Sequence, residues 1–326
     1  MNNVRLGFSL GSILSIEEIF DCAKILNNFS TDSIWIPETW GMDCCSILSN
    51  VSSIANKPKL GSSIINIYSR SPALIAMSAA ALDTLSNGRF ILGLGTSSRP
   101  IVEDWHGLEF KNPLQRMREY VNIIRLILSG EKVSYDGKIF HLKNFDLLIS
   151  PYSKEIPIYL AAINQKMVDL TWEIANGVIF YLRPLPELKK TIQKMQARKK
   201  IDVACQIITC VSEDPEKAIT RAKQTIAFYV SVGKIYREFL ASNGFQNETV
   251  EIFDEYKKSG LKDNYKFVTD EMVNSLAICG NPEDIQRKIP KFVESGIDLP
   301  ILQFNPVGKV SESFELLIRT LSSEMK

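Results

Sequence analysis

The sequence predicts an α/β fold, a (β/α)8 barrel with insertions, and three observations support that prediction. Short apolar segments alternate with longer amphipathic segments about eight times along the 326 residues, a rhythm typical of parallel sheets. Residues 90–95 (FILGLG) are apolar without alternation, as expected for a strand buried on both faces. Thr96, Ser97 and Ser98 follow at once, at the strand end where such barrels bind ligands.

The first four strand–helix units are expected within the first 130 residues. Ser15 is a good N-cap, and an acidic pair follows it in the first turn. Ser71–Pro72 opens a later helix, and Asn87–Gly88 ends it with residues that tolerate a left-handed backbone. The expected strands are residues 4–10, 33–37, 60–65 and 90–95, and the expected helices are residues 15–28, 43–55, 71–86 and 113–128.

Residues 131–150 interrupt this rhythm, because two short strand-like segments flank the turn signal Asp136–Gly137. We expect a small hairpin insertion there and a helical, charged insertion at about residues 234–278. The remaining strands are expected at residues 156–161, 178–181, 202–211 and 299–304, and the helices at 165–175, 185–198, 214–232, from 281 onward and at 311–322. No linker or repeat suggests a second domain, so residues 1–326 are predicted to form one barrel domain.

Composition excludes several function classes. The formal net charge is +1, which gives no electrostatic case for nucleic-acid binding. No apolar run reaches membrane-spanning length, and Glu17 and Glu18 stand where a signal peptide would be apolar. The six cysteines form no C-x-x-C pair and the two histidines are far apart, so we expect no metal site. These features predict a reduced, cytoplasmic protein.

The strand assignment alone nominates a ligand site, because barrels bind ligands just after each strand. Asn66 is a strong candidate, since an amide at an apolar strand tip needs a partner. The nominated residues are Leu10, Glu38, Asn66, Thr96, Ser97, Ser98, Ala162, Ile163, Asn164, Tyr181 and Phe304.

A long ordered motif then carries a resemblance to a known family. It consists of R-S-P at residues 70–72, A-x-L-D-x-L-S-x-G-R-F-x-L-G-L-G-T-S at 80–97 and W-H-G at 105–107. This pattern resembles the luciferase-like monooxygenase superfamily, and within it the oxidoreductases that use the deazaflavin coenzyme F420, such as methylenetetrahydromethanopterin reductase. The resemblance implies the bacterial luciferase-like TIM barrel, an enzyme acting on a small molecule, and a homodimer.

The resemblance also implies cofactor contacts. It places coenzyme F420 against Asn66 and the small polar residues after the fourth strand, and it implies a cis peptide at Ser63–Ile64. Backbone amides after the fifth strand would hold the phosphate, which suits the N-terminus of a helix. The implied cofactor-binding residues are Asn66, Thr96, Ser97, Ser98, Ala162, Ile163, Asn164, Lys166 and Met167.

The chain departs from its relatives at the expected acid and base positions. Many relatives have Asp-His where this chain has Glu38–Thr39, others have Glu or Asp where it has Ser98, and the reductase has Glu where it has Gly7. Glu38 is the candidate proton donor or ring contact, and the alternative is a solvated or helix-capping carboxylate.

Three further residues have two interpretations each. Trp40 is either a wall of the substrate pocket or a packed loop anchor. His106 is a candidate pocket residue, although a hydrogen bond that fixes its loop is the simpler interpretation. Arg70 is expected to form a structural salt bridge.

The sequence therefore predicts an oxidoreductase that moves a hydride between coenzyme F420 and a small organic substrate. The main alternative is an FMN-dependent monooxygenase. The second alternative is a cofactor-binding barrel without turnover, in which bulky Arg99 and Ile163 narrow the pocket where relatives often have glycine.

Overall fold

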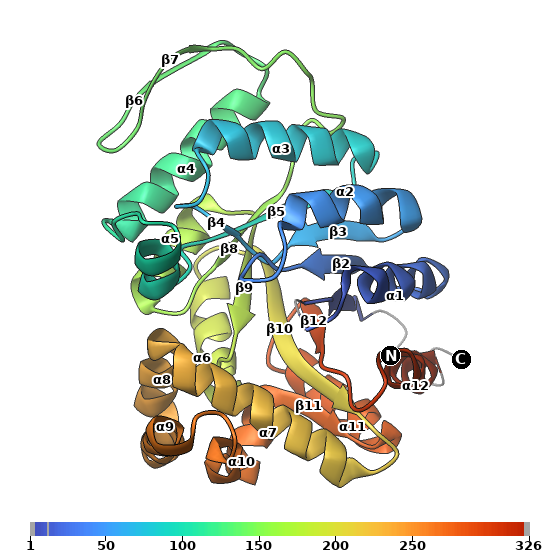
Figure 1. Cartoon of the computed structure of the whole chain (residues 1–326). Helices are drawn as coiled ribbons and strands as arrows, with labels where there is room; N and C mark the ends of the chain where they lie inside the picture. Colours follow the sequence, from blue (N-terminus) through green and yellow to red (C-terminus); the bar gives the residue numbers. More distant parts are fainter. Residues whose placement is uncertain (1–3, 12, 323–326) are drawn as a thin grey trace. The chain divides into compact units, whose positions relative to one another are not determined.

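The computed structural model describes residues 4–11 and 13–322, which have the predicted (β/α)8-barrel fold (Figure 1). Strands and helices alternate along the chain, and the strand pairings within the barrel are parallel. In the described residues the eight barrel strands are β1 (Gly7–Ser9), β2 (Ser33–Ile36), β3 (Lys59–Ser62), β5 (Phe90–Gly95), β8 (Ile158–Ala161), β9 (Gly177–Tyr181), β10 (Asp202–Val211) and β12 (Leu299–Phe304).

Contacts divide the chain into two compact units, which are described one at a time. Unit 1 comprises residues 1–22 and 180–326, and unit 2 comprises residues 23–179. The single-domain organisation stays a prediction.

Unit 2 contains neighbouring strands in the order β2-β3-β5-β8-β9. The expected third strand, residues 60–65, is instead broken into β3 and a short β4 (Ile65–Asn66), both paired with β5. Five residues of this broken strand, Gly61 to Ile65, lie opposite four residues of β5, Ile91 to Leu94, so the break is a bulge. The helices of this unit are α2 (Cys44–Ile54), α3 (Pro72–Leu85), α4 (Pro113–Leu128) and α5 (Gln165–Ile174).

Local signals explain where these helices begin and end. Asp43 caps α2 and Ser71 caps α3, each through a side-chain oxygen that accepts a backbone N–H of the first turn. After α3, Asn87 and Gly88 have φ of 54° and 80°, as predicted. Ser15 likewise caps α1 (Ile16–Asn28) by accepting the N–H of Glu18 at 3.2 Å.

The hairpin predicted at residues 131–150 is formed by β6 (Val133–Asp136) and β7 (His141–Phe145), at the upper edge of Figure 1. Its turn is fixed by Glu119 of α4, which is buried. The Glu119 carboxylate accepts the backbone N–H groups of Lys138, Ile139 and Phe140 at 2.9–3.1 Å. This one side chain therefore satisfies three turn donors.

Unit 1 contains neighbouring strands in the order β11-β10-β12-β1. Strand β11 (Ala277–Gly280) was not predicted, because a four-residue apolar run that follows a helix directly has no strand periodicity of its own. The main helices are α6 (Leu185–Gln196), α7 (Pro215–Val232), α11 (Pro282–Val293) and α12 (Val310–Ser322).

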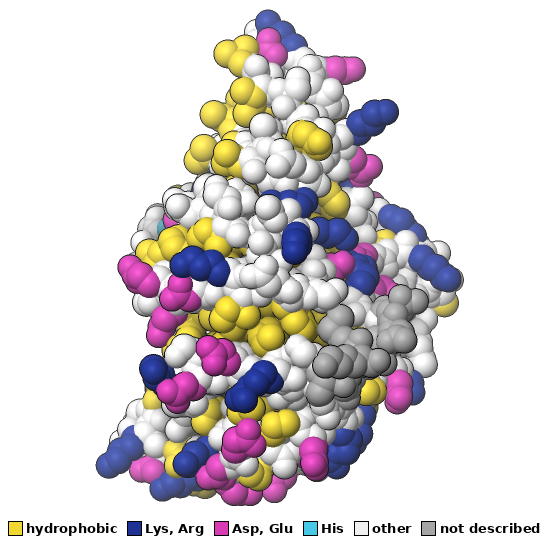
Figure 2. Space-filling view, turned by 90° about the vertical axis from the view of Figure 1, so that its right-hand side faces the viewer, with side chains coloured by type: hydrophobic (Ala, Val, Ile, Leu, Met, Phe, Trp, Pro, Cys, Tyr) yellow, Lys and Arg dark blue, Asp and Glu magenta, His cyan; other side chains and the backbone are white. Residues whose placement is uncertain are grey.

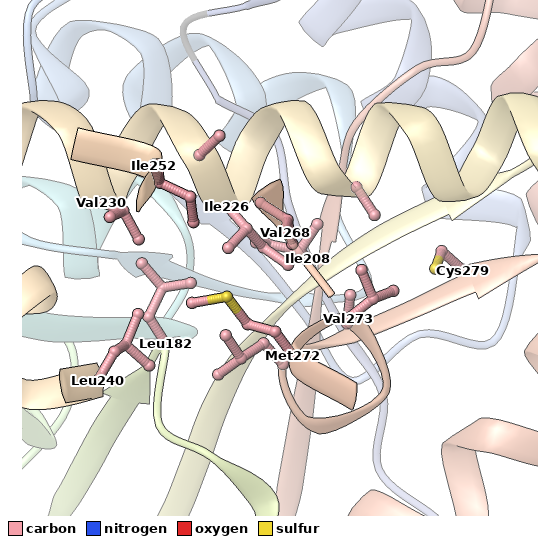
Figure 3. Packing of buried hydrophobic residues seen from close by; sticks show 14 of the residues in the cluster. Leu182, Ile208, Ile226, Val230, Leu240, Ile252, Val268, Met272, Val273 and Cys279 are labelled. Atoms are coloured by element: carbon pink, nitrogen blue, oxygen red, sulfur yellow. The ribbon is translucent and has the colours of Figure 1, made fainter. Parts of the chain in front are cut away.

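The helical insertion predicted at about residues 234–278 consists of α8 (Lys234–Leu240), α9 (Gln246–Ser259) and α10 (Asp270–Leu276). A kinked π-helical segment (Ala241–Phe245) joins α8 to α9, and the connection from α9 to α10 contains a 3-10 helix (Asn264–Phe267). Figure 3 shows how it packs: Ile252 of α9 and Met272 of α10 lie among side chains of α7 and β10, such as Ile226 and Ile208. All of these side chains are fully buried, so the insertion shares a core with the barrel elements of unit 1.

The face shown in Figure 2 carries no dominant charge. Lysine, arginine, aspartate and glutamate side chains are interspersed on the face shown in Figure 2, in keeping with the net charge of +1. Within the described residues, none of the helices combines the length and the apolar character needed to cross a membrane.

Candidate functional site

The carboxyl ends of β2, β4, β5 and β8 carry most of the predicted site residues, and all of these ends belong to unit 2. Glu38 follows β2, Asn66 ends β4, and Thr96 follows β5. Residues 162–167 join β8 to α5. Because β2, β3, β5 and β8 are parallel neighbours, the fold gathers these residues at one edge of the sheet.

A cis peptide joins Ser63 to Ile64, as the resemblance implied. Two glycines of β5 leave room for this bulge. A Cβ on Gly93 would lie 1.9 Å from the carbonyl oxygen of Ser62, and one on Gly95 would lie 2.6 Å from the Ile64 side chain. The Ser62 hydroxyl donates to the Gly93 carbonyl and accepts the Gly93 N–H, both at 2.9 Å. The Ser62 side chain thus replaces the backbone hydrogen bonds between neighbouring strands that the bulge removes.

Two polar atoms beside this bulge are buried and lack a hydrogen-bond partner among the described residues. They are the Oγ of Ser63 and the Nδ2 of Asn66. The Oδ1 of Asn66 accepts the N–H of Tyr68 at 2.9 Å, which fixes the amide and leaves its donor end unused. Buried donors are normally paired, so a free one at a strand end indicates a binding position.

The segment after β5 is polar and half-buried. Ser97 has a φ of 58°, and the Ser98 carbonyl accepts the N–H of Val102 at 3.0 Å where a π-helical turn (Ile101–Trp105) begins. Arg99 is turned to its own loop: its guanidinium pairs with Glu103, and its side chain is 62% exposed. The structure therefore places the Arg99 side chain largely in solvent.

The segment after β8 leads into the N-terminus of α5. Asn164 is the N-cap, and its Oδ1 accepts the N–H of Met167 at 3.0 Å. Ala162 and Met167 are buried, whereas Lys166 is exposed. The helix dipole and a nearby ammonium group favour an anion at this position.

Glu38 is part of an ion cluster. Arg70 pairs with both Glu38 and Asp43, which confirms the structural role expected for Arg70. The other carboxylate oxygen of Glu38 accepts the N–H of Cys44 at 3.2 Å. Burial disfavours ionised Asp43, but hydrogen bonds from Ser46 and the charge of Arg70 outweigh burial and lower its pKa. Glu38 is thus held as an ionic hydrogen-bond acceptor.

The same cluster acts on two cysteines at the start of α2. A hydrogen bond from the Cys44 thiol lowers the pKa of Cys45, and the charge of Arg70 adds to this effect against the opposing effect of burial. Cys44 is fully buried, and Cys45 is half-buried. The ion cluster therefore extends to the first turn of α2.

The two predicted pocket residues lie in exposed loops. The Trp40 ring meets the Trp105 ring edge-to-face, with 5.9 Å between centroids, and the two side chains are 47% and 55% exposed. His106 is also exposed, and its backbone N–H donates to the Ile101 carbonyl at 3.2 Å. The structure brings Trp40 and the loop of His106 together, and a substrate contact for either residue stays a prediction.

Unit 1 holds the other strand-end residues. Leu10 is fully buried and Phe304 packs on Phe314 of α12 at 4.9 Å, so both are core residues. The Tyr181 hydroxyl donates to the Oε1 of Gln303 at 2.9 Å. Sequence reasoning missed Gln303 and Ser9, although each is a single polar residue in an otherwise apolar strand, which was a usable signal.

Comparison with known proteins adds three findings. The family model described as luciferase-like monooxygenase matches residues 4–299. The 5,10-methylenetetrahydromethanopterin reductase of Archaeoglobus fulgidus is 27% identical over 336 residues, covering 99% of this chain and 100% of the relative. The coenzyme F420-dependent tetrahydromethanopterin reductase of Methanopyrus kandleri has a similar structure, with a TM-score of 0.87 at 24% identity over 99% of this chain and 100% of the other.

A second solved structure shares the fold. An F420-dependent secondary alcohol dehydrogenase, in complex with an F420–acetone adduct, matches with a TM-score of 0.80 at 17% identity, over 99% of each chain. At such identities the structural matches establish the fold alone.

Proposed function

The chain belongs to the luciferase-like monooxygenase family, and we propose that within it the protein is a coenzyme F420-dependent oxidoreductase. In this proposal a hydride moves between the deazaflavin ring and a small organic substrate. The names of two relatives support the cofactor, since one structural neighbour is an F420-dependent reductase and another an F420-dependent dehydrogenase.

One observation carries the proposal. The Asn66 amide is 3% exposed, its oxygen is fixed by Tyr68, and its Nδ2 has no partner in the described part of the chain. The unpartnered Oγ of Ser63 lies three residues away along the bulge. Two unused polar groups at one strand end suit a ligand ring with hydrogen-bonding edges, so the residues present fit the deazaflavin.

Further residues suit the rest of the cofactor. Thr96, Ser97 and Ser98 offer hydroxyl groups after β5. The N-terminus of α5, with exposed Lys166, suits a phosphate. We therefore assign backbone donors of Ala162, Ile163 and Asn164, together with Lys166 and Met167, to the phosphate end.

When bound, coenzyme F420 supplies the hydride chemistry, and the protein supplies binding, orientation and exclusion of water. Asn66 and Ser63 hold the ring edge. Glu38 is fixed by Arg70 and by the Cys44 N–H, and we propose that it orients the ring or the substrate from the end of β2. Because these contacts hold the Glu38 side chain in place, Glu38 suits the role of a fixed hydrogen-bond acceptor better than that of a mobile proton donor.

Two alternatives remain testable. The first is an FMN-dependent monooxygenase, in line with the description of the family as monooxygenases. A cofactor-binding barrel without turnover is the other alternative, since the Asp-His pair of many relatives is Glu38–Thr39 here.

The decisive experiment is a parallel fluorescence titration of the protein with oxidised coenzyme F420 and with FMN. We expect micromolar binding of F420 and at least about ten-fold weaker binding of FMN. Tighter binding of FMN would support the monooxygenase, and binding of neither would contradict both enzyme proposals.

A matched pair of variants tests the site itself. Asn66→Asp removes the amide donor at nearly constant size and should weaken F420 binding about ten-fold or more. Asn50→Asp makes the same change on an exposed residue of α2 and should bind like the parent protein. Equal binding by N66D and the parent protein would contradict the assignment of Asn66.

We also propose a cytoplasmic homodimer. The six cysteines are free thiols, which suits a reducing compartment. Leu74, Met77 and Leu85 of α3 are large apolar residues that are 46–55% exposed, which suits contact with a second copy. Light scattering coupled to size-exclusion chromatography tests the dimer, and a mass of one chain would contradict it.

A further inference from the structure

A second group of unused polar atoms lies in unit 1, on one face of the β1–β12 pair. Ser9 of β1 and Gln303 of β12 are register partners, so their side chains share a face. Phe8 and Phe304 occupy the opposite face, where both rings contact Phe314 of α12. Ser9 and Gln303 therefore lie on the face of the strands that α12 does not cover.

Both polar residues have hydrogen-bonding capacity that the described residues do not use. The Ser9 Oγ is fully buried and has no partner among the described residues. The Gln303 amide is oriented by the Tyr181 hydroxyl, which donates to its Oε1 at 2.9 Å. This bond leaves the two Nε2 donors of Gln303 available, on a strand about 4.8 Å from that of Ser9.

Tyr181, whose hydroxyl bonds Gln303, belongs to a group of three tyrosines that packs against the hydrophobic core of unit 1. The Tyr181 ring meets those of Tyr229 on α7 and Tyr236 on α8 edge-to-face at 5.1 and 5.8 Å, and the latter two meet at 5.7 Å. Burial raises the pKa of Tyr181 and of Tyr236, so both phenols are neutral at physiological pH. We call Ser9, Gln303, Tyr181, Tyr229 and Tyr236 the Ser9–Gln303 cluster, and it contains no Lys, Arg, His, Asp or Glu side chain.

We propose that the Ser9–Gln303 cluster binds the carbonyl group of a flat, uncharged substrate. The proposal rests on the oxidoreductase function and names the substrate class for it. Ser9 and Gln303 offer neutral donors to the two lone pairs of one carbonyl oxygen. The tyrosine rings favour a conjugated, planar body through edge-to-face contacts. A carboxylate fits poorly, because neutral donors do not offset the loss of hydration of a buried charge.

The test uses three small probes on cofactor-free protein, so that its result is independent of the F420 titration. Acetophenone carries a flat ring and a carbonyl, ethylbenzene lacks the carbonyl, and benzoate carries a charge. Ligand-observed NMR should give a Kd on the order of 1 mM for acetophenone. Ethylbenzene and benzoate should each bind at least about five-fold more weakly. Equal binding of ethylbenzene, or tighter binding of benzoate, would overturn the proposal.

A matched pair of glutamine variants locates the binding. Gln303→Met keeps the length of the side chain, removes the amide donors and should weaken acetophenone about five-fold while leaving ethylbenzene unchanged. Gln286→Met removes an amide of α11 that bonds the Thr320 carbonyl at 2.9 Å, and it should leave both probes unchanged. Thermal unfolding confirms that each variant is folded. Unchanged acetophenone binding in Q303M, or equal weakening in Q286M, would contradict the assignment.

The two proposals can fail separately. Binding of F420 without selective acetophenone binding would overturn the substrate class and leave the oxidoreductase standing. Selective acetophenone binding without F420 binding would overturn the F420-dependent function and leave the assignment of the carbonyl-binding cluster standing.

Discussion

Two serines are fully buried, Ser62 in unit 2 and Ser9 in unit 1, and they differ in whether the hydroxyl has a hydrogen-bond partner in the described part of the chain. The Ser62 hydroxyl makes two hydrogen bonds with the Gly93 backbone, whereas the Ser9 hydroxyl makes none within the described residues. A buried polar group that the protein itself satisfies contributes to stability. One that it leaves unsatisfied costs stability and is retained where a ligand supplies the partner.

The same contrast runs through the candidate site. Arg70, Glu38 and Asp43 satisfy one another, and Glu38 also accepts a backbone N–H. Asn66 and Ser63, a few residues from the Ser62 bonds, keep unused polar atoms. We therefore expect substitutions in the satisfied set to change stability, and substitutions in the unsatisfied set to change binding.

The largest effect is expected for Gly93→Ala. The added Cβ would lie 1.9 Å from the Ser62 carbonyl oxygen, which is backbone and cannot turn away. We expect a loss of about 4 kcal/mol in the free energy of unfolding, measured in urea. Gly95→Ala is the graded comparison, because its Cβ meets the Ile64 side chain, which can move. Equal losses in the two variants would show that the close approach of Ser62 is not the constraint.

The second-largest effect on stability is expected for Ser62→Ala. It leaves both the N–H and the carbonyl of Gly93 without their side-chain partner in a fully buried strand. We expect a loss of about 3 kcal/mol in the same urea measurement. A loss below about 1 kcal/mol would mean that other groups replace the serine.

Arg70→Met tests the ion cluster and should cost about 1 kcal/mol at pH 7, since Asp43 is 40% exposed and water screens its charge. The folded-state pKa of Asp43 is lowered, so its stabilisation is present above the unfolded pKa and is lost as pH falls through the folded value. The difference between parent and variant should therefore shrink on acidification. A difference that stays constant from pH 7 down to pH 2 would contradict this account.

The smallest effect on stability is expected for Ser9→Ala. Removing an unpartnered buried hydroxyl should leave the protein as stable as before or up to about 1 kcal/mol more stable. Thermal unfolding measures this change. A clear loss of stability would reveal a partner for Ser9 and would weaken the comparison with Ser62.

Much of the architecture could be predicted from local pattern. Apolar runs located the barrel strands, Ser71–Pro72 and Asn87–Gly88 marked the ends of α3, and strand ends pointed to Asn66. The motif resemblance added the cis peptide at Ser63–Ile64, which the structure contains. Each of these features depends on residues close together in the sequence or on a long shared motif.

The features that escaped prediction depend on distant partners. Nothing near Ser62 in the sequence shows that its hydroxyl replaces ladder bonds to Gly93, 31 residues away. Likewise Ser9 and Gln303 become neighbours only through the register of β1 and β12. The salt bridge expected for Arg70 could not be assigned to Glu38, because the two residues are 32 apart in the sequence.

The buried carboxylate of Glu119 has a consequence for which substitutions the hairpin of residues 131–150 can accept. It accepts hydrogen bonds from the backbone N–H groups of Lys138 and Ile139, and every amino acid except proline has such a group. These hydrogen bonds to Glu119 therefore do not depend on which side chains occupy the two positions. Substitutions of Lys138 or Ile139 by residues other than proline should therefore leave the turn anchored by the one glutamate on α4.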